Sequence, residues 1–301
     1  MTTLTILSPS EIRRRIKTHY SDEFIKRVVD INRDYAGADQ VLSWIQGHIA
    51  SSGSYSEERK NVYLPLLRKW TKTSNGLLIE IGCGLGQGSV VYASAGYDVV
   101  SVDMTAISVR TARMRAHEDG VLCQFVVADA HKLPFKDGMF DICMCIEVIE
   151  HVRQHKETVL CETCRVAKKG GIIEIETPNR LWPKDFHSTQ LYLINYFPQR
   201  IAEIYAGARR RLFKDGLDRY VTYPFIAKKL AQCQCEIIGD TLGLDFAGFK
   251  NMIQDPHYSP KSKLKIIFPA VTRLCKVPGF GAIMKLARVF VPLIIITARK
   301  T

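Results

Sequence analysis

The sequence lacks long apolar runs, an apolar N-terminus and a second zinc-type cysteine motif. Its longest apolar runs are too short to span a bilayer. Residues 1–15 hold no apolar run before a cleavage site, so we expect no secretory signal and a cytoplasmic location. In that reducing compartment the nine scattered cysteines are expected to be free thiols. No second C-x-x-C or spaced His pair follows Cys161 and Cys164, so no structural zinc site is predicted.

Acidic residues are absent after Asp255, so much of the chain's net positive charge lies in the residues that follow it. The chain carries 42 Lys and Arg against 30 Asp and Glu, a formal charge of +12, and nine basic residues follow Asp255. Such an excess favours an anionic partner, such as a phospholipid surface, a phosphorylated substrate or nucleic acid. The basic segment has few aromatic residues for stacking on bases and no RNA-binding module is visible, so nucleic acid is the less favoured partner.

Residues 251–288 combine this charge with helical apolar spacing. One predicted helix face holds Leu264, Ile267, Phe268, Val271 and Cys275, with lysines and arginines around it. A basic amphipathic segment of this kind can lie on an anionic membrane surface, which would make the protein peripheral to the membrane. The alternative is an ordinary helix packed on the core with solvated lysines.

The spacing of apolar residues along the chain predicts a helical cap at 1–70 followed by one α/β domain at 71–301. Apolar residues make up 47% of the 301, enough for a full core. Short apolar runs alternate with helical segments, which predicts a parallel sheet covered on both faces. Residues 178–220 and 251–288 break the rhythm and are interpreted as an acceptor lid and a second insertion. The predicted strands cover 77–81, 98–102, 123–127, 139–146, 172–176, 235–238 and 291–298.

A glycine-rich turn runs from Glu80 to Gly86, directly after the first predicted strand and before a helix. Glycines permit a tight turn and close approach of a ligand, and the following helix offers free N–H groups to a carboxylate. Asp103 ends the second strand, where it can accept ribose hydroxyls, and Asp129 ends the third, where it can meet an adenine edge. Since parallel strands end at one sheet edge, Glu80, Asp103 and Asp129 are expected to converge on one crevice.

The glycine-rich turn belongs to the first of four sequence motifs that follow one another along the chain. They cover residues 78–84, 129–135, 147–152 and 168–171. Together they make residues 77–177 resemble the class I S-adenosylmethionine (SAM)-dependent methyltransferases, in their type 11 branch. The resemblance implies a doubly wound, seven-strand Rossmann-like sheet, SAM as the cofactor and methyl transfer as the reaction.

Carried over position by position, the resemblance also implies a set of cofactor contacts. Turn residues would surround the methionine part of SAM, Asp103 would hold the ribose, and further residues would meet the adenine and the sulfonium. The turn residues are Glu80, Gly82, Cys83, Gly84 and Gly86; the adenine residues are Met104, Asp129 and Ala130; the sulfonium residues are Ile146 and Glu147. The alternatives are a purely structural turn or an NAD site, although an NAD site usually has a glycine where Gln87 stands.

The catalytic candidates are His187 and Glu147. His187 follows the fifth strand within the lid and is the best general-base candidate, or else a lid residue that fixes a turn. The string Glu147-x-x-Glu150-His151 resembles the metal site of small-RNA 2′-O-methyltransferases and ubiquinone-pathway O-methyltransferases. It could hold a divalent ion with His187 as fourth ligand. Many metal-independent relatives carry the same string, with Glu150 and His151 as a cap and a packing group.

We therefore expect a SAM-dependent methyltransferase that methylates oxygen on a small molecule, a glycan or a lipid-linked intermediate. Two alternatives stay open: a metal-assisted RNA 2′-O-methyltransferase and a catalytically silent SAM-binding protein.

Overall fold

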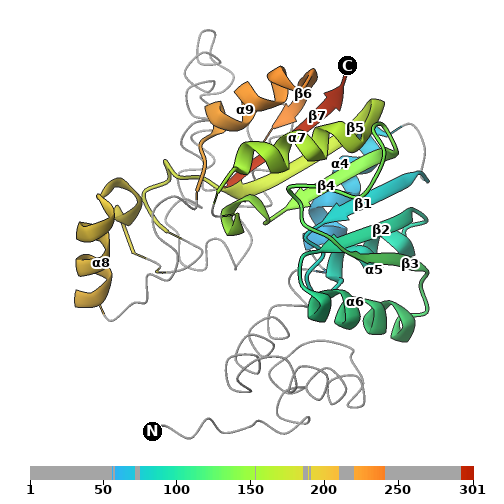
Figure 1. Ribbon diagram of the computed structural model, residues 1–301, viewed down its shortest axis with the longest axis horizontal. Coiled ribbons are helices and arrows are strands. Elements are labelled where there is room, and N and C mark those ends of the chain that lie inside the picture. Colours follow the sequence, from blue (N-terminus) through green and yellow to red (C-terminus); the bar gives the residue numbers. More distant parts are fainter. Residues whose placement is uncertain are drawn as a thin grey trace, which may run out of the picture. The chain divides into compact units, whose positions relative to one another are not determined.

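The computed structural model describes residues 56, 58–71, 75–152, 154–185, 189, 191–209, 220–240 and 293–301. The chain divides into two compact units, Met1–Ala130 and His131–Thr301 (Figure 1). Most of the predicted helical cap at 1–70 and the whole basic segment at 251–288 lie outside the described residues, so both remain predictions. Among the helices that the structure describes, none is both long enough and apolar enough to cross a bilayer.

The first unit contains three strands and the helices that connect them. In chain order its elements are η1 (Arg59–Tyr63), α4 (Leu64–Trp70), β1 (Leu77–Ile81), α5 (Gln87–Ser94), β2 (Asp98–Asp103), α6 (Ala106–Glu118) and β3 (Cys123–Val127). The strands lie parallel in the order β3-β2-β1. Consequently the chain turns that follow all three strands lie at one edge of this part of the sheet.

Continuous apolar runs explain why these strands form. In β1, Leu78, Ile79 and Ile81 are all buried, as expected for a parallel strand covered on both faces. Helix α6 buries Val109, Ala112 and Ala116, which are spaced three and four residues apart, in a cluster with Cys83 and Phe125. The predicted bounds of β1 and β3 agree with the structure.

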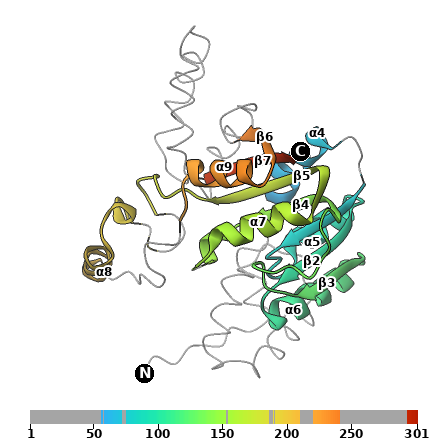
Figure 2. The same ribbon diagram turned by 45° about the horizontal axis from the view of Figure 1, so that its top comes forward.

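The second unit contains four strands with helices beside them. Its elements are β4 (Phe140–Ile146), η2 (Ile149–His151), α7 (Lys156–Val166), β5 (Ala167–Pro178), η3 (Ile194–Tyr196), α8 (Gln199–Ala208), α9 (Tyr223–Gln232), β6 (Cys235–Asp240) and β7 (Leu293–Lys300). The strand order is β4-β5-β7-β6. Helices α7 and α9 lie side by side over these strands (Figure 2). The α/β fold class predicted from the sequence is thus confirmed.

The prediction of a wholly parallel sheet was wrong at β7. This strand runs antiparallel to both of its neighbours and lies between β5 and β6. Its apolar core, Ile294 to Ile296, is buried or nearly so. Burial on both faces gives the same apolar, β-branched pattern in either strand direction, so the sequence carries no signal for the orientation.

Candidate cofactor-binding site

The glycine turn after β1 is held by the end of β2. The N–H groups of Gly82 and Cys83 donate to the carbonyl oxygen of Val102 at 2.8 and 2.9 Å, and the Gly86 N–H donates to the Cys83 carbonyl at 2.8 Å. Gly82, Gly84 and Gly86 have φ values of 73°, 50° and 79°. These left-handed conformations favour glycine, which explains the three glycines in this short turn.

Asp103 fixes the turn from the end of β2. Its Oδ2 accepts the Gly84 N–H at 3.0 Å, and its Oδ1 accepts the backbone N–H and the hydroxyl of Thr105 at 2.9 and 2.8 Å. Thr105 directly precedes α6, but its side chain accepts no helix N–H and bonds Asp103 and Ser108 instead. The Asp103 carboxylate is therefore oriented before any ligand arrives.

The surface beside this carboxylate is open. A Cβ added to Gly84 would meet no atom within 4 Å, Gly82 and Asp129 are exposed, and the Met104 side chain is 74% exposed. Ala130, also predicted at the adenine, is half-buried beyond the end of β3. The N-terminus of α5, an oriented carboxylate and an apolar thioether suit a ligand with a carboxylate, a ribose and a purine. These residues fit the SAM that the sequence leads us to expect.

Glu80 lies beneath the turn and not on its open side. Its side chain is buried, and the Ser89 hydroxyl donates to its Oε2 at 2.5 Å while the Ser101 hydroxyl donates to Ser89 at 2.8 Å. Burial raises the pKa of Glu80 to about 7, although the Ser89 hydrogen bond opposes this shift. Sequence reasoning missed Ser89 and Ser101, for which the only signal is a pair of small polar residues in otherwise apolar elements.

Cys83 turns inward as well. Its side chain is 4% exposed and packs with Val109 and Ala112 of α6, so only its backbone belongs to the open turn. Burial raises the pKa of this thiol well above its usual range. Cys83 is therefore a small core side chain, and its N–H is used by the hydrogen bond to Val102.

In the second unit, the residues after β4 adopt an unusual backbone. Ile146 ends the strand and is 6% exposed, and Glu147 follows with φ 56°, a left-handed conformation that is rare outside glycine. The Glu147 N–H donates to the Glu176 carbonyl of β5 at 3.1 Å. Such strain collects at binding and catalytic positions, where the surrounding structure holds it.

The remaining members of the predicted metal string have different surroundings. Glu150 is 2% exposed and its Oε2 accepts the Thr177 hydroxyl at 3.2 Å, whereas His151 is exposed. Within the described ranges, no group of three or more His, Cys, Asp or Glu side chains is arranged to hold a metal ion. His187 lies outside the described residues, so the four-ligand hypothesis stays a prediction.

Asp185 anchors residues on either side of His187 in the segment predicted to be a lid. This buried carboxylate accepts the Tyr220 hydroxyl through Oδ1 and the N–H and hydroxyl of Thr189 through Oδ2, all at 2.6 Å. A separate small core of Ile194, Ala202 and Ala206 joins η3 to α8. The described part of the segment at 178–220 thus has packing and hydrogen bonds of its own.

Comparison with known proteins agrees with this geometry. Residues 79–175 match the family model described as a methyltransferase domain. The ubiquinone biosynthesis O-methyltransferase of Rickettsia conorii is 31% identical over 121 residues, which are 39% of this chain and 41% of that protein. The norajmaline N-methyltransferase of Rauvolfia serpentina is 38% identical over 102 residues, 33% of this chain and 34% of that protein. The chain therefore spans about half the length, or less, of the curated relatives it matches.

Solved structures share the fold at low sequence identity. The magnesium protoporphyrin IX methyltransferase of Synechocystis, solved with bound SAH, is 14% identical with a TM-score of 0.53 over 91% of this chain and 100% of that one. The PH0226 protein of Pyrococcus horikoshii is 19% identical with a TM-score of 0.52 over 81% of this chain and 91% of that one. At these identities the likeness shows the fold alone, which is the α/β fold that the motifs imply.

Proposed function

Because the chain carries a class I SAM-dependent methyltransferase domain, we propose that it transfers the methyl group of SAM to an oxygen atom of a small-molecule acceptor. The observation that supports this most directly is Asp103. Its carboxylate is held by Gly84 and Thr105 beside an open glycine turn, which is the arrangement that a ribose-containing cofactor needs.

The chain's own residues bind and orient the cofactor, whose contribution when bound is a methyl group activated by a sulfonium. The N-terminus of α5 would receive the carboxylate, and the glycines before it would leave room for its approach. Asp103 would accept the ribose hydroxyls through lone pairs that Gly84 and Thr105 leave available, Met104 would cover the adenine, and Asp129 would accept its amino group. Orientation matters most here, because a displacement requires the acceptor oxygen to lie in line with the methyl group.

On the acceptor side we assign the proton transfer to His187. A hydroxyl acceptor becomes a better nucleophile when a neighbouring base takes its proton, and histidine titrates in the right range. Glu147, strained at the end of β4, is the second candidate for contact with the reacting atoms. Oxygen as the acceptor atom is favoured by the relatives named as ubiquinone biosynthesis O-methyltransferases.

A lipid-linked acceptor at the cytoplasmic surface of an anionic membrane is our preferred form of this substrate. It is supported by apolar side chains exposed on the lid, where Ile204 of α8 is 72% exposed and Ile201 is 50% exposed. Apolar side chains on a lid can receive an acceptor's hydrocarbon part or the membrane that contains it. The basic residues predicted at 251–288 would add attraction to anionic lipid.

The test begins with SAM binding by calorimetry to the wild type, Asp103→Ala and Asp98→Ala. Asp98 is the matched control, because it is an exposed aspartate at the opposite end of the same strand. We expect the wild type to bind SAM. The affinity for SAM should fall at least tenfold in Asp103→Ala and should stay unchanged in Asp98→Ala. If the wild type does not bind SAM, or if both variants bind equally, the proposed cofactor site is wrong.

The second step follows labelled methyl transfer from SAM to catechols, lipid-linked phenols, glycans and short RNA, with and without a chelator. Transfer to a phenolic hydroxyl supports the proposal. Transfer only to RNA, abolished by the chelator, would replace it with the metal-assisted RNA enzyme. Tight SAM binding without any transfer would favour a silent SAM-binding protein.

A further inference from the structure

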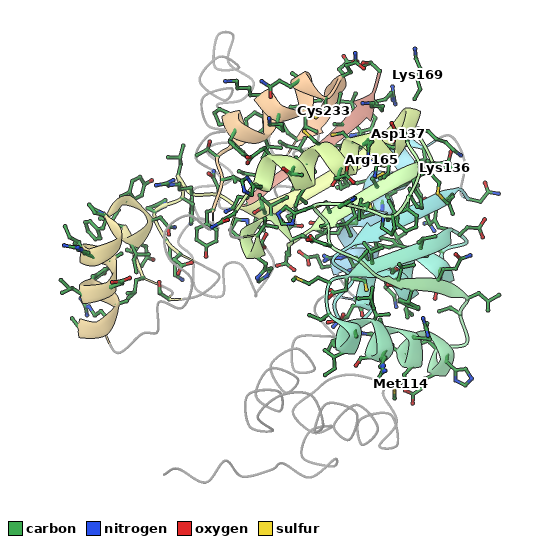
Figure 3. All side chains as sticks on the ribbon, viewed as in Figure 1. Met114, Lys136, Asp137, Arg165, Lys169 and Cys233 are labelled. Atoms are coloured by element: carbon green, nitrogen blue, oxygen red, sulfur yellow. The ribbon has the colours of Figure 1, made fainter. Side chains whose placement is uncertain are left out.

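Two cysteines from distant parts of the chain meet outside the proposed site. The Sγ of Cys161, in α7, lies 3.1 Å from the Sγ of Cys233, at the C-terminal end of α9. Figure 3 shows Cys233 where α7 and α9 lie together. Both side chains are half-buried, and neither has a role in the proposed methyl transfer. At this separation a small movement suffices to form a sulfur–sulfur bond of about 2.05 Å.

A second pair of thiols belongs to the same elements. Cys164 follows one turn after Cys161 in α7, and Cys235 begins β6 two residues after Cys233. These side chains are 1% and 7% exposed, so the outer pair, Cys161 and Cys233, is the one that reagents reach first. In the sequence these four cysteines form two separate local motifs, a C-x-x-C at 161 and 164 and a C-x-C at 233 and 235. The fold brings them together.

The electrostatic surroundings differ among these thiols: burial and the hydrogen bond with Cys161 raise the pKa of Cys233 to about 11. Lys300, near the end of β7, donates from Nζ to the carbonyl oxygen of Cys233 at 2.6 Å, which brings a positive charge to the turn. A hydrogen bond from Cys164, together with the charge of Lys300, lowers the pKa of Cys235. A nearby cation favours the thiolate that thiol–disulfide exchange requires, whereas the raised pKa of Cys233 opposes it, so it is the 3.1 Å separation of the Cys161 and Cys233 sulfur atoms that favours exchange.

We propose that Cys161 and Cys233 form a reversible disulfide when the protein meets a low-molecular-weight disulfide such as oxidised glutathione. In the first step the thiolate of one cysteine attacks a glutathione sulfur, which forms a mixed disulfide and releases one glutathione thiolate. In the second step the thiolate of the other cysteine attacks the protein sulfur of the mixed disulfide, and the second glutathione leaves as a thiolate. Two protein thiols are oxidised, one glutathione disulfide is reduced to two thiols, and the two protons pass to solvent or to the released thiolates.

The bond would join α7 to α9 and close the chain between residues 161 and 233. This interval contains β5 and the lid, including His187. A cross-link over so long a stretch restricts the unfolded chain strongly, so the oxidised protein should be the more stable form. The proposal does not depend on the acceptor or on methyl transfer.

The test uses the full chain, titrated with oxidised glutathione and then digested without reduction. Cleavage after glutamate separates Cys161 from Cys164, because Glu162 lies between them. We expect the wild type to lose two thiols, to yield a linked peptide containing Cys161, and to unfold several degrees higher than the reduced form. Dithiothreitol should reverse all three changes. Cys161→Ser and Cys233→Ser should give no link, while the control Cys123→Ser, a half-buried thiol elsewhere, should behave as the wild type.

Three outcomes would overturn the proposal. One is a mixed glutathione adduct on Cys161 or Cys233 that never proceeds to the link. Another is a link that joins Cys164 to Cys235 in the wild type and survives in Cys161→Ser. The third is one zinc ion per chain in native mass spectra of the reduced protein, lost in the same serine variants, which would make the cluster a metal site.

Discussion

The Cα of Gly88 lies directly against the carboxylate of Glu80. A Cβ built on Gly88 would be 1.9 Å from Glu80 Oε1 and 3.1 Å from the ring of Tyr92. The first turn of α5 therefore requires glycine because a buried carboxylate occupies the space of a side chain. This carboxylate is the one that Ser89, the next residue in the helix, holds from the other oxygen.

Gly88→Ala is expected to lower the free energy of unfolding by about 1–3 kcal/mol, because a methyl group must displace a buried, hydrogen-bonded side chain. The matched control is Gly207→Ala in α8, where an added Cβ meets no atom within 4 Å. That change should be neutral or should stabilise the protein by up to about 1 kcal/mol through helix propensity. Urea unfolding measures both, and equal effects would contradict the described position of Glu80.

The raised pKa of Glu80 predicts a pH-dependent stability. The pKa rises from 4.5 to about 7 on folding, so the folded protein holds a proton that the unfolded chain releases between these values. Stability should therefore fall as pH rises from about 4.5 to 7 and then level off, by an amount on the order of 3 kcal/mol.

Glu80→Gln should remove this contribution, while Glu118→Gln, at an exposed position, should not. Burial also raises the pKa of Glu174, to about 8, so the informative quantity is the difference between each variant and the wild type, in which Glu174 cancels. The measurement is the free energy of unfolding at pH 5, 6, 7 and 8. An unchanged slope in Glu80→Gln would show that Glu80 is ionised in the folded protein throughout this range.

The sequence predicted local features of the fold well. The bounds of β1 and β3 were predicted residue for residue, since each has a clear apolar run and a glycine or polar boundary. The place of Asp103 at a strand end followed from the same pattern. The fold class followed from the alternation of strands and helices together with the ordered motifs.

Features that depend on distant pairing were not predictable. The orientation of β7 depends on which backbone it bonds, and its apolar run fits either direction. The inward position of Glu80 depends on Ser89 and Ser101 from two other elements. Cys161 and Cys233 are 72 residues apart, and nothing in their separate motifs indicates that they meet.

Gly84 and Gly86 are expected to respond differently to alanine. At Gly86 a Cβ would lie 2.8 Å from the Cβ and 2.9 Å from the Cα of Ala112, and φ is +79°, so Gly86→Ala should destabilise the fold by at least about 2 kcal/mol. At Gly84 the space is open and only the left-handed φ is strained, so Gly84→Ala should cost about 1 kcal/mol of stability. Its methyl group would point into the open turn and should weaken SAM binding at least tenfold. Thermal unfolding and calorimetry separate the two effects, and wild-type SAM affinity in Gly84→Ala would place the cofactor elsewhere.

Arg165 of α7 organises the chain that leads into β4. Its guanidinium donates to both carboxylate oxygens of Glu162 at 2.7 Å and to the carbonyl oxygens of Leu133 and Phe135 at 3.0 and 2.8 Å. It also donates to Asp137 at 2.8 Å, and Figure 3 shows these two side chains together. Only a planar guanidinium can make these bonds at once.

Arg165→Lys keeps the positive charge but loses most of the hydrogen bonds that the guanidinium makes. We therefore expect the free energy of unfolding to fall by about 1–2 kcal/mol at pH 7. The control is Arg200→Lys, at an exposed position on α8, which should change the free energy of unfolding by less than about 0.5 kcal/mol. The Arg165 hydrogen bond lowers the pKa of Glu162, so this carboxylate stabilises the fold above its unfolded pKa of about 4.5, and the contribution is lost as pH falls below that value. The difference between wild type and Arg165→Lys should therefore shrink from pH 6 to pH 3 in urea unfolding. A difference that stays constant over this range would mean that the carbonyl contacts at Leu133 and Phe135, and not the ion pair, supply the stability.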